Sequence, residues 1–308
     1  ANQIPRKIGQ IGLCHALNSR GGIHSEFTIL REAVDSFYLV SAGALQRLDH
    51  DYIRRFLPSD GTVEYTHLTD AMGVLVLAGP KSRDILTKLS STDFSNESFR
   101  WLTAQNIEIN GCSINAMRVN YVGELGWELH HPIIHQNQIF DALFDIGEEF
   151  GLKPFGIRAM DSMRLEKSYR MVGTELSIEY SAFESGMDRF ICLDKNDFIG
   201  RKELIKWQER GFKNQLVTLD VDGIEEADAL GNNALTIAGK LIGRATSGGF
   251  GFRVNRSLAL AMVKPQYATI GTEFSIDILG KNYVAKVIQE SPFDSQNKRL
   301  RDVIDIDN

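Results

Sequence analysis

The stretch from Arg118 to His130, which reads Arg-Val-Asn-Tyr-Val-Gly-Glu-Leu-Gly-Trp-Glu-Leu-His, holds the most concentrated set of side chains that could bind a ligand. As an extended strand it would place Tyr121 on a largely apolar face and both Glu124 and Glu128 on the opposite face. Two carboxylates on one face repel each other unless a hydrogen-bond donor lies between them. Two glycines within a strand indicate a bulge or a group that approaches the backbone closely. The pattern therefore fits either a ligand-binding strand or a strand whose polar face is in water.

Arg158 is also in an unusual place, because it falls in the first turn of a helix expected over residues 154–169. A cation at a helix N-terminus opposes the helix dipole by about 0.3–1 kcal/mol. It therefore requires a compensating acidic group, which is either a bound ligand or Asp161 one turn further along the helix.

Two more stretches hold charged residues near a turn or near the chain end. Glu26 follows the tight turn Arg20-Gly21-Gly22 and, taken alone, is typical of an exposed turn residue. The basic cluster that includes Lys298 and Arg299 is typical of a solvated chain end, although it could also pair with an anionic ligand.

The cysteine and histidine patterns predict no metal centre. Cys14, Cys112 and Cys192 are scattered, and neither C-x-x-C nor H-E-x-x-H occurs. The phosphate-binding motifs G-x-x-x-x-G-K-[ST] and G-x-G-x-x-G are also missing from the sequence. The glycines of residues 246–251 come closest, and we interpret them as a turn. The chain itself is therefore not expected to bind FAD, NAD or ATP in a Rossmann or Walker manner.

The composition is that of a globular protein of two or more domains. The chain has 308 residues, of which 43% are hydrophobic and 24% charged, and a formal net charge of −6. No basic run indicates nucleic acid as a partner. No apolar stretch reaches the roughly 20 residues that span a bilayer. We expect neither a nucleic-acid nor a membrane partner, and a reducing compartment for the three cysteines.

Strands and helices alternate through the first 200 residues, which favours an α+β arrangement. Strands are expected around a charged turn at 27–40, at 74–77 and across 105–130. Helices are expected at 41–57, 80–89, 132–150 and 154–169.

The last hundred residues have a different pattern. From Asn214 onward, short runs rich in Val, Ile, Leu and Thr are separated by Gly and Asn, which predicts a small antiparallel sandwich or barrel. The polar segment 206–213 is the expected boundary. We therefore expect two domains, residues 1–210 and residues 211–308.

Together these stretches resemble the aminomethyltransferase family, which includes the T-protein of the glycine cleavage system and the folate domains of dimethylglycine and sarcosine dehydrogenases. Any one matching segment is a weak indication, whereas an ordered set over nearly the whole chain is specific. Six segments match in order: 17–28, 120–128, 156–169, 194–201, 243–249 and 291–301. The sequence Gly-Gly-Ile-His-Ser-Glu-Phe-Thr in the first segment is more similar to that of the dehydrogenase relatives than to that of the glycine cleavage protein.

The resemblance implies two mixed α/β pieces and a C-terminal β-barrel around a central hole, with tetrahydrofolate as the ligand. By the motif match, Glu128 would hold the pterin ring through the N–H groups of that ring, since a carboxylate suits adjacent donors. Arg158 would lie beside the pterin and keep Glu128 ionised. Glu124 and Tyr121 belong to the same folate-binding segment, and Tyr121 could pack on the ligand.

By the same resemblance, Lys298 or Arg299 would meet the glutamate tail of folate. Glu26 occupies the position at which the glycine cleavage protein has its catalytic Asp. It would orient the folate nitrogens N5 and N10 and accept the proton that is lost as the one-carbon unit is captured. Glutamate is one methylene longer than aspartate, which changes the geometry of proton handling but keeps the acid.

The function that the resemblance implies is that of an enzyme, a tetrahydrofolate-dependent transferase of the aminomethyltransferase type. It would move a one-carbon unit from an amine or iminium to tetrahydrofolate and give 5,10-methylenetetrahydrofolate. The donor implied is a small amine-derived molecule, and the partner implied is an FAD-dependent oxidase domain or subunit. The compartment implied is the cytoplasm, or the mitochondrial matrix in a eukaryote.

Three alternatives stay open. The first is folate-dependent demethylation of a sulfonium substrate, against which the acid at Glu26 argues. The second is a non-catalytic folate-binding accessory protein, whose relatives carry Lys-Gly-Cys where this chain reads Tyr169-Arg-Met-Val-Gly-Thr174. The third is an inactive remnant, because the family has a longer segment before the Asn-x-x-Gly-Gly turn than the residues that precede Asn18 here.

Overall fold

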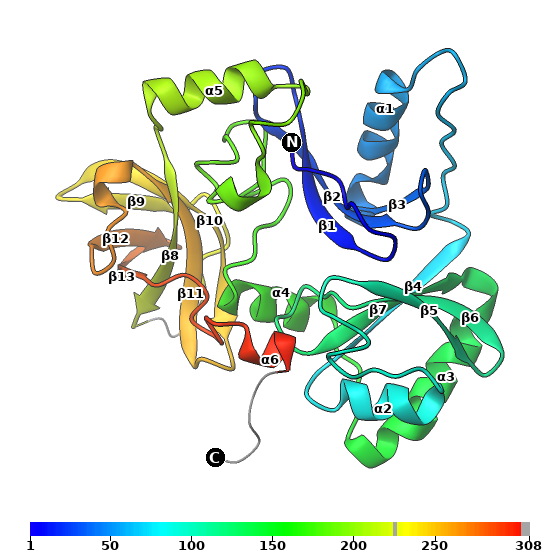
Figure 1. Cartoon of the computed structure of the whole chain (residues 1–308). Helices are drawn as coiled ribbons and strands as arrows, with labels where there is room; N and C mark the ends of the chain where they lie inside the picture. The colour runs from blue at the N-terminus through cyan, green and yellow to red at the C-terminus, as the bar shows by residue number, and fades with distance from the viewer. Residues whose placement is uncertain (224–226, 303–308) are drawn as a thin grey trace.

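The computed structural model describes residues 1–223 and 227–302, and its elements form three pieces (Figure 1). A three-stranded sheet comes first, a four-stranded sheet with helices follows, and a closed six-stranded barrel forms the C-terminal piece. This confirms the expected α+β class with a C-terminal antiparallel β-barrel. Of the expected domain 211–308, the segments 224–226 and 303–308 lie outside the described residues. No helix within the described ranges is long and apolar enough to cross a bilayer.

The three-stranded sheet is antiparallel and has β2 in its centre. Its strands are β1 (Ile11–Leu17), β2 (Ile23–Arg31) and β3 (Phe37–Val40). The side chain of Asn18 closes the turn between β1 and β2, because its Oδ1 accepts hydrogen bonds from the N–H groups of Arg20 and Gly22 at 2.9 and 3.1 Å. Gly21 adopts φ +82°, which glycine tolerates best. This turn fixes which residues of β1 and β2 face each other.

The four-stranded sheet has the order β4-β7-β6-β5. Its strands are β4 (Met72–Ala78), β5 (Ala104–Ile109), β6 (Cys112–Met117) and β7 (Gly126–Pro132). The helices α2 (Ser82–Leu89) and α3 (Gln136–Gly147) pack against the core of this sheet, in which Trp127 is fully buried. Because side chains alternate along β7, Trp127 and Leu129 point into this core, whereas Glu128 and His130 point to the opposite face.

Residues 118–125 form a loop, so the expectation of one continuous strand is wrong for this part of the chain. Asn120 closes the loop: its Oδ1 accepts two backbone N–H groups at 3.0 Å each, and its Nδ2 donates to the carbonyl of Glu124 at 2.7 Å. Gly123 has φ +74°, outside the extended region. Since β7 begins only after this loop, Glu124 and Glu128 do not share a strand face.

Three further helices connect the pieces. They are α1 (Gln46–Phe56), α4 (Ile157–Glu166) and α5 (Arg201–Arg210), with short 3-10 turns at 43–45, 133–135, 148–150, 188–190 and 265–267. Helix α4 contacts β10 and β11 of the barrel and lies between the barrel and the four-stranded sheet (Figure 1). It begins three residues later than the sequence pattern predicts, after Gly156 in extended conformation.

The barrel is closed and antiparallel, in the order β10-β11-β8-β13-β12-β9. Its strands are β8 (Gln215–Asp222), β9 (Ala234–Ile237), β10 (Lys240–Gly251), β11 (Arg256–Val263), β12 (Glu273–Ile278) and β13 (Lys281–Ile288). Alternate residues of these strands fill the interior with valine, leucine, isoleucine and alanine side chains.

Residues 246–251 form the end of strand β10 and not the predicted turn. A side chain at Gly248 would collide with the carbonyl of Ala229, and one at Gly251 would crowd Glu166 at the end of α4. The glycines therefore allow neighbouring groups to approach a strand closely.

After β13 the chain leaves the barrel and turns back toward the four-stranded sheet, where α6 (Lys298–Arg301) lies close to α4 (Figure 1). Arg118, after β6, donates through Nη2 to the carbonyl of Arg301 at 3.1 Å. Lys167, directly after α4, donates to the carbonyls of residues 293 and 294 at 2.9 and 2.6 Å. The C-terminal segment thereby joins the barrel, α4 and the four-stranded sheet.

Candidate functional site

Glu26 lies in the middle strand of the three-stranded sheet, directly opposite His15 on β1. The Nε2 atom of His15 and the Oε2 atom of Glu26 are 2.8 Å apart. The side chain of His15 is fully buried, whereas that of Glu26 is 21% exposed. Glu26 is therefore the member of this pair that a ligand can reach.

Glu128 has a similar arrangement on β7. The Nε2 atom of His130 lies 3.2 Å from Oε2 of Glu128, and the hydroxyl of Tyr38 lies 3.1 Å from Nδ1 of His130. His130 is fully buried and Glu128 is 21% exposed. Burial raises the pKa of Tyr38, and the nearby carboxylates of Glu32 and Glu128 raise it further. Because Tyr38 belongs to β3, this chain of contacts connects the two sheets that carry Glu26 and Glu128.

Each of these two acids has one carboxylate oxygen without a partner in the described part of the chain. Three other acids are fully buried and differ in this respect. Glu166 pairs with Arg253. Glu175 accepts from two side-chain hydroxyls and one backbone N–H, and Glu184 accepts from five backbone or side-chain donors. Free oxygens on partly exposed acids can accept hydrogen bonds from a ligand, whereas saturated buried acids hold the fold together.

Tyr121 lies near Glu26, whose negative charge contributes to the raised pKa of the tyrosine. The main cause of that raised pKa is burial, and the positive charge of Arg164 acts in the opposite direction. The hydroxyl of Tyr121 donates to the carbonyl of Arg170, and its ring stacks on Tyr169 with centroids 5.8 Å apart. The residue is therefore held firmly by the protein itself.

Glu124 and Arg299, both predicted folate-binding residues, are close in space. One oxygen of Glu124 lies 3.8 Å from Nη1 of Arg299, and the other accepts from Nη1 of Arg253 at 2.9 Å. The guanidinium groups of Arg253 and Arg299 lie over the ring of Phe293, at 3.8 and 5.4 Å from its centroid. Glu124 is thus paired by the protein, while Arg299 remains about half exposed.

Arg158 and Lys298 are exposed. Within residues 1–223 and 227–302, the side chain of Arg158 forms neither an ion pair nor a hydrogen bond, and Glu128 pairs with His130 instead. The structure therefore does not join Arg158 to Glu128 as the sequence led us to expect. Both cations remain accessible to an anionic ligand.

Sequence reasoning missed the two histidines and the tyrosine that support the acids, His15, His130 and Tyr38. His130 could have been found, because it lies two residues after Glu128 and so shares a strand face with it. The position of His15 depends on the register of the hairpin around Asn18, which includes an irregularity between residues 16 and 17. Periodicity alone does not predict such a shift.

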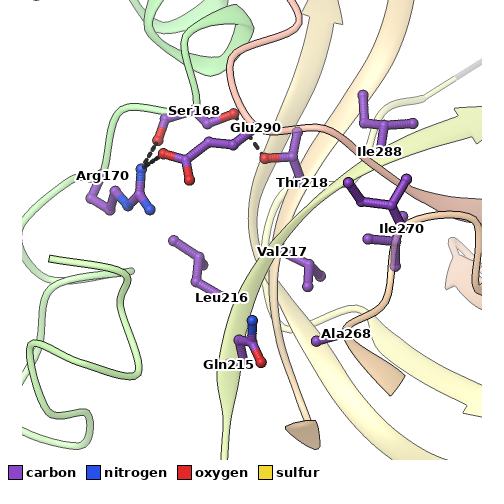
Figure 2. Close-up of a pocket in the computed structure, with 11 residues that line it drawn as sticks. Ser168, Arg170, Gln215, Leu216, Val217, Thr218, Ala268, Ile270, Ile288 and Glu290 are labelled. Atoms are coloured by element: carbon purple, nitrogen blue, oxygen red, sulfur yellow. Dashed lines mark hydrogen bonds and ion pairs between the residues drawn. The ribbon is translucent and has the colours of Figure 1, made fainter. Parts of the chain in front are cut away.

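Two cavities lie away from these acids. One of about 100 Å³ lies between β8, the end of β13 and residues 168–170, where Arg170 pairs with Glu290 (Figure 2). It is too small for a drug-sized ligand, which occupies roughly 300–1,000 Å³. An open depression of about 370 Å³ is lined by Val254, Arg256, Ile288, Gln289 and Pro292. Neither of these two contains a predicted site residue.

The described ranges contain no group of three His, Cys, Asp or Glu side chains placed to hold a metal ion. Cys14, Cys112 and Cys192 are free thiols in different parts of the fold.

The chain therefore consists of a mixed α/β region that presents acids from two sheets, joined to a small closed barrel. Residues 1–195 match the GCVT N-terminal domain, and residues 214–294 match the glycine cleavage T-protein C-terminal barrel domain. The chain belongs to the glycine cleavage T-protein family, which confirms the resemblance to aminomethyltransferases. The aminomethyltransferase T of the glycine cleavage system from Bartonella henselae has the same fold, with a TM-score of 0.81 at 22% identity over 94% of this chain and 77% of that one.

Three relatives show where the chain matches longer proteins. The mitochondrial dimethylglycine dehydrogenase of Homo sapiens is 35% identical over 94% of this chain and 34% of the relative. The mitochondrial sarcosine dehydrogenase of Mus musculus is 32% identical over 93% of this chain and 33% of the relative. An aminomethyltransferase of Thermoanaerobacter sp. (strain X514) is 29% identical over 95% of this chain and 78% of the relative. The chain thus spans about a third of the length of the two dehydrogenases.

Proposed function

We propose that this chain is a tetrahydrofolate-dependent one-carbon transferase that forms 5,10-methylenetetrahydrofolate. The observation that carries the proposal is the pair of partly exposed acids, Glu26 and Glu128, each with one carboxylate oxygen free for a ligand. Membership of the glycine cleavage T-protein family supports the same reaction class, since an aminomethyltransferase is among its relatives.

The residues present fit the chemistry of a reduced folate. The pterin edge offers adjacent N–H donors, which suit the free oxygen of Glu128 because charge-assisted hydrogen bonds are strong. The glutamate tail is anionic and suits the half-exposed guanidinium of Arg299 and the ammonium group of Lys298. Tyr121 is proposed to pack against the ligand beside Glu26, and Arg158 to supply a further exposed cation.

Tetrahydrofolate supplies two nucleophilic nitrogens, N5 and N10, which hold the one-carbon unit. The part of Glu26 is to orient these nitrogens and to accept the proton that is released when the unit is captured. The accepting atom is Oε1, because Oε2 already forms a hydrogen bond with His15. Its 21% exposure allows the carboxylate to pass that proton to water.

The donor and the partner are proposed from the relatives. Dimethylglycine and sarcosine dehydrogenases match this chain over about a third of their length, which leaves room in those proteins for an oxidising part. We therefore propose a small amine-derived one-carbon donor and an FAD-dependent oxidase domain or subunit that delivers it. The proposed location is the cytoplasm, or the mitochondrial matrix in a eukaryote.

Calorimetric titration with tetrahydrofolate, kept reduced, tests the binding half of this proposal. Glu128→Gln keeps the shape of the side chain but removes its charge, which should weaken binding by about 1.5–3 kcal/mol, or roughly 10–150-fold in Kd. Glu179→Gln is the matched control, because Glu179 is an exposed acid paired with Arg244 on the surface. Equal Kd values for the parent and Glu128→Gln would mean that Glu128 does not bind tetrahydrofolate. Folate binding without catalysis would indicate an accessory protein instead.

A further inference from the structure

In the contact between His15 and Glu26, only Glu26 can be reached by a ligand. The two residues are opposite each other on β1 and β2, and one hydrogen bond of 2.8 Å joins Nε2 of His15 to Oε2 of Glu26. His15 is fully buried, so it cannot touch a ligand that reaches Glu26. Any influence of His15 on the chemistry of the site must therefore pass through the carboxylate.

The surroundings of the second ring nitrogen of His15 favour one form of the imidazole. Nδ1 is buried and has no hydrogen-bond partner in the described part of the chain. The ring of Phe190 lies edge-on at 6.0 Å. A protonated imidazole would leave an unpaired N–H and a positive charge in these surroundings, which is costly. The neutral ring with its proton on Nε2 avoids both costs and donates that proton to Glu26.

His130 differs in this respect, although it supports Glu128 in the same way. Both of its ring nitrogens have partners, the hydroxyl of Tyr38 and the carboxylate of Glu128. His15 thus has one hydrogen-bond partner where His130 has two, which restricts His15 to the role of a donor to a single carboxylate oxygen.

We infer that His15 is the positioning residue of Glu26: it holds Oε2 as a hydrogen-bond donor and leaves Oε1 as the one atom of the acid available to the folate nitrogens. Glutamate has one more rotatable bond than aspartate, so a bond at one oxygen removes the extra freedom of the longer side chain. The inference rests on the proposed function and deepens it, because it names the residue that fixes the geometry of the proton acceptor.

Two variants separate positioning from support of the fold. His15→Gln retains an N–H donor that can reach Oε2, whereas His15→Leu fills the same space without a donor. The assay follows formation of 5,10-methylenetetrahydrofolate from formaldehyde and tetrahydrofolate, with release of one water, after subtraction of the uncatalysed rate. We expect His15→Leu to lower the catalysed rate about 10–100-fold with Kd for tetrahydrofolate within about threefold, and His15→Gln to restore most of the rate. His67→Leu, which removes an exposed histidine, is the control.

Nitrogen NMR of the histidine side chains gives a readout that needs no folate. In the parent, His15 should carry its proton on Nε2, and its signals should change in Glu26→Gln. A proton on Nδ1, or a parent-like rate in a folded His15→Leu variant, would overturn the inference. If the parent does not accelerate the reaction, the proposed function fails, whereas the spectrum still decides whether His15 donates to Glu26. If His15→Leu does not fold, the His15→Gln rate and the spectra decide. A rate near that of the parent in folded His15→Gln, with His15 signals that change in Glu26→Gln, supports positioning. A lost rate in folded His15→Gln, or unchanged His15 signals in Glu26→Gln, overturns it.

Discussion

Arg253 lies in the hairpin between β10 and β11, and its guanidinium joins the barrel to α4 and to the loop before β7. Its Nε pairs with Glu166, its Nη1 with Glu124 at 2.9 Å, and its Nη2 donates to the carbonyls of Val122 and Met163 at 3.0 and 2.9 Å. Glu166 is fully buried, and Arg253 is 20% exposed. Replacement of Arg253 therefore tests whether this contact couples the barrel to the rest of the chain.

Arg253→Met removes the charge that compensates Glu166 and leaves this acid only the backbone N–H of residue 253 at 2.6 Å. Removal of one partner from a buried pair costs about 3–5 kcal/mol. Because one fifth of Arg253 is in contact with water, we expect a loss at the lower end, about 3 kcal/mol of the free energy of unfolding. In the double variant with Glu166→Gln the buried charge is gone, so about 1–2 kcal/mol should be recovered.

Urea denaturation followed by far-UV circular dichroism measures this loss, provided that a single transition is seen. Arg256→Met is a matched control three residues away, because Arg256 pairs with Asp220 across 3.1 Å and their side chains are 51% and 31% exposed. That pair should be worth less than about 1 kcal/mol. A loss in Arg253→Met no larger than in Arg256→Met would refute the reasoning, and so would a double variant that is less stable than Arg253→Met alone.

Two further predictions concern the loop before β7. Gly123→Ala should lower the free energy of unfolding by about 2–4 kcal/mol, because φ is +74° and the new Cβ would lie 2.5 Å from the side chain of the buried Lys167. Gly111 has the same φ but open space around it, so Gly111→Ala should lower the free energy of unfolding by only about 1–2 kcal/mol. Equal losses for the two variants in urea denaturation would contradict this prediction. Burial raises the pKa of Tyr121 well above its ordinary value of 10.0. As pH rises, the unfolded state therefore loses its phenolic proton first, so the free energy of unfolding is constant below about pH 10 and falls above it. Tyr121→Phe should reduce that fall by about 1.4 kcal/mol per pH unit. An unchanged dependence of the free energy of unfolding on pH would count against this prediction.

Much of the fold could be predicted from the sequence because the buried faces repeat with clear periods. The helices at 46–56, 82–89 and 136–147 and the short strands of the barrel follow from apolar spacing and turn residues. The glycines of β10 could not be assigned in this way, because their role depends on Ala229 and Glu166, which approach from distant parts of the chain. A glycine-rich local sequence fits a turn and also fits a strand to which other parts of the chain approach closely.

The candidate site was predictable to the level of residue types and not to the level of contacts. The resemblance to the aminomethyltransferase family points to Glu26 and Glu128, and the structure gives each a buried histidine partner. The alternating residues of 118–125 mimic a strand although they form a loop, and Asn120 followed by Gly123 is the turn signal in this stretch. The surroundings of Arg158 could not be deduced, since a charge at a helix start indicates compensation without naming its source.

The rate of 5,10-methylenetetrahydrofolate formation in Glu26→Gln, measured together with Kd for tetrahydrofolate, tests the central claim most directly. Glu26→Gln keeps the size of the side chain but removes the proton acceptor at Oε1. Loss of a general base lowers a rate by about 10²–10⁴-fold. We predict a fall of this size in the catalysed rate, with Kd within about threefold of the parent. A parent-like rate, or a loss confined to Kd, would contradict the assignment of Glu26 as the proton acceptor of a one-carbon transferase.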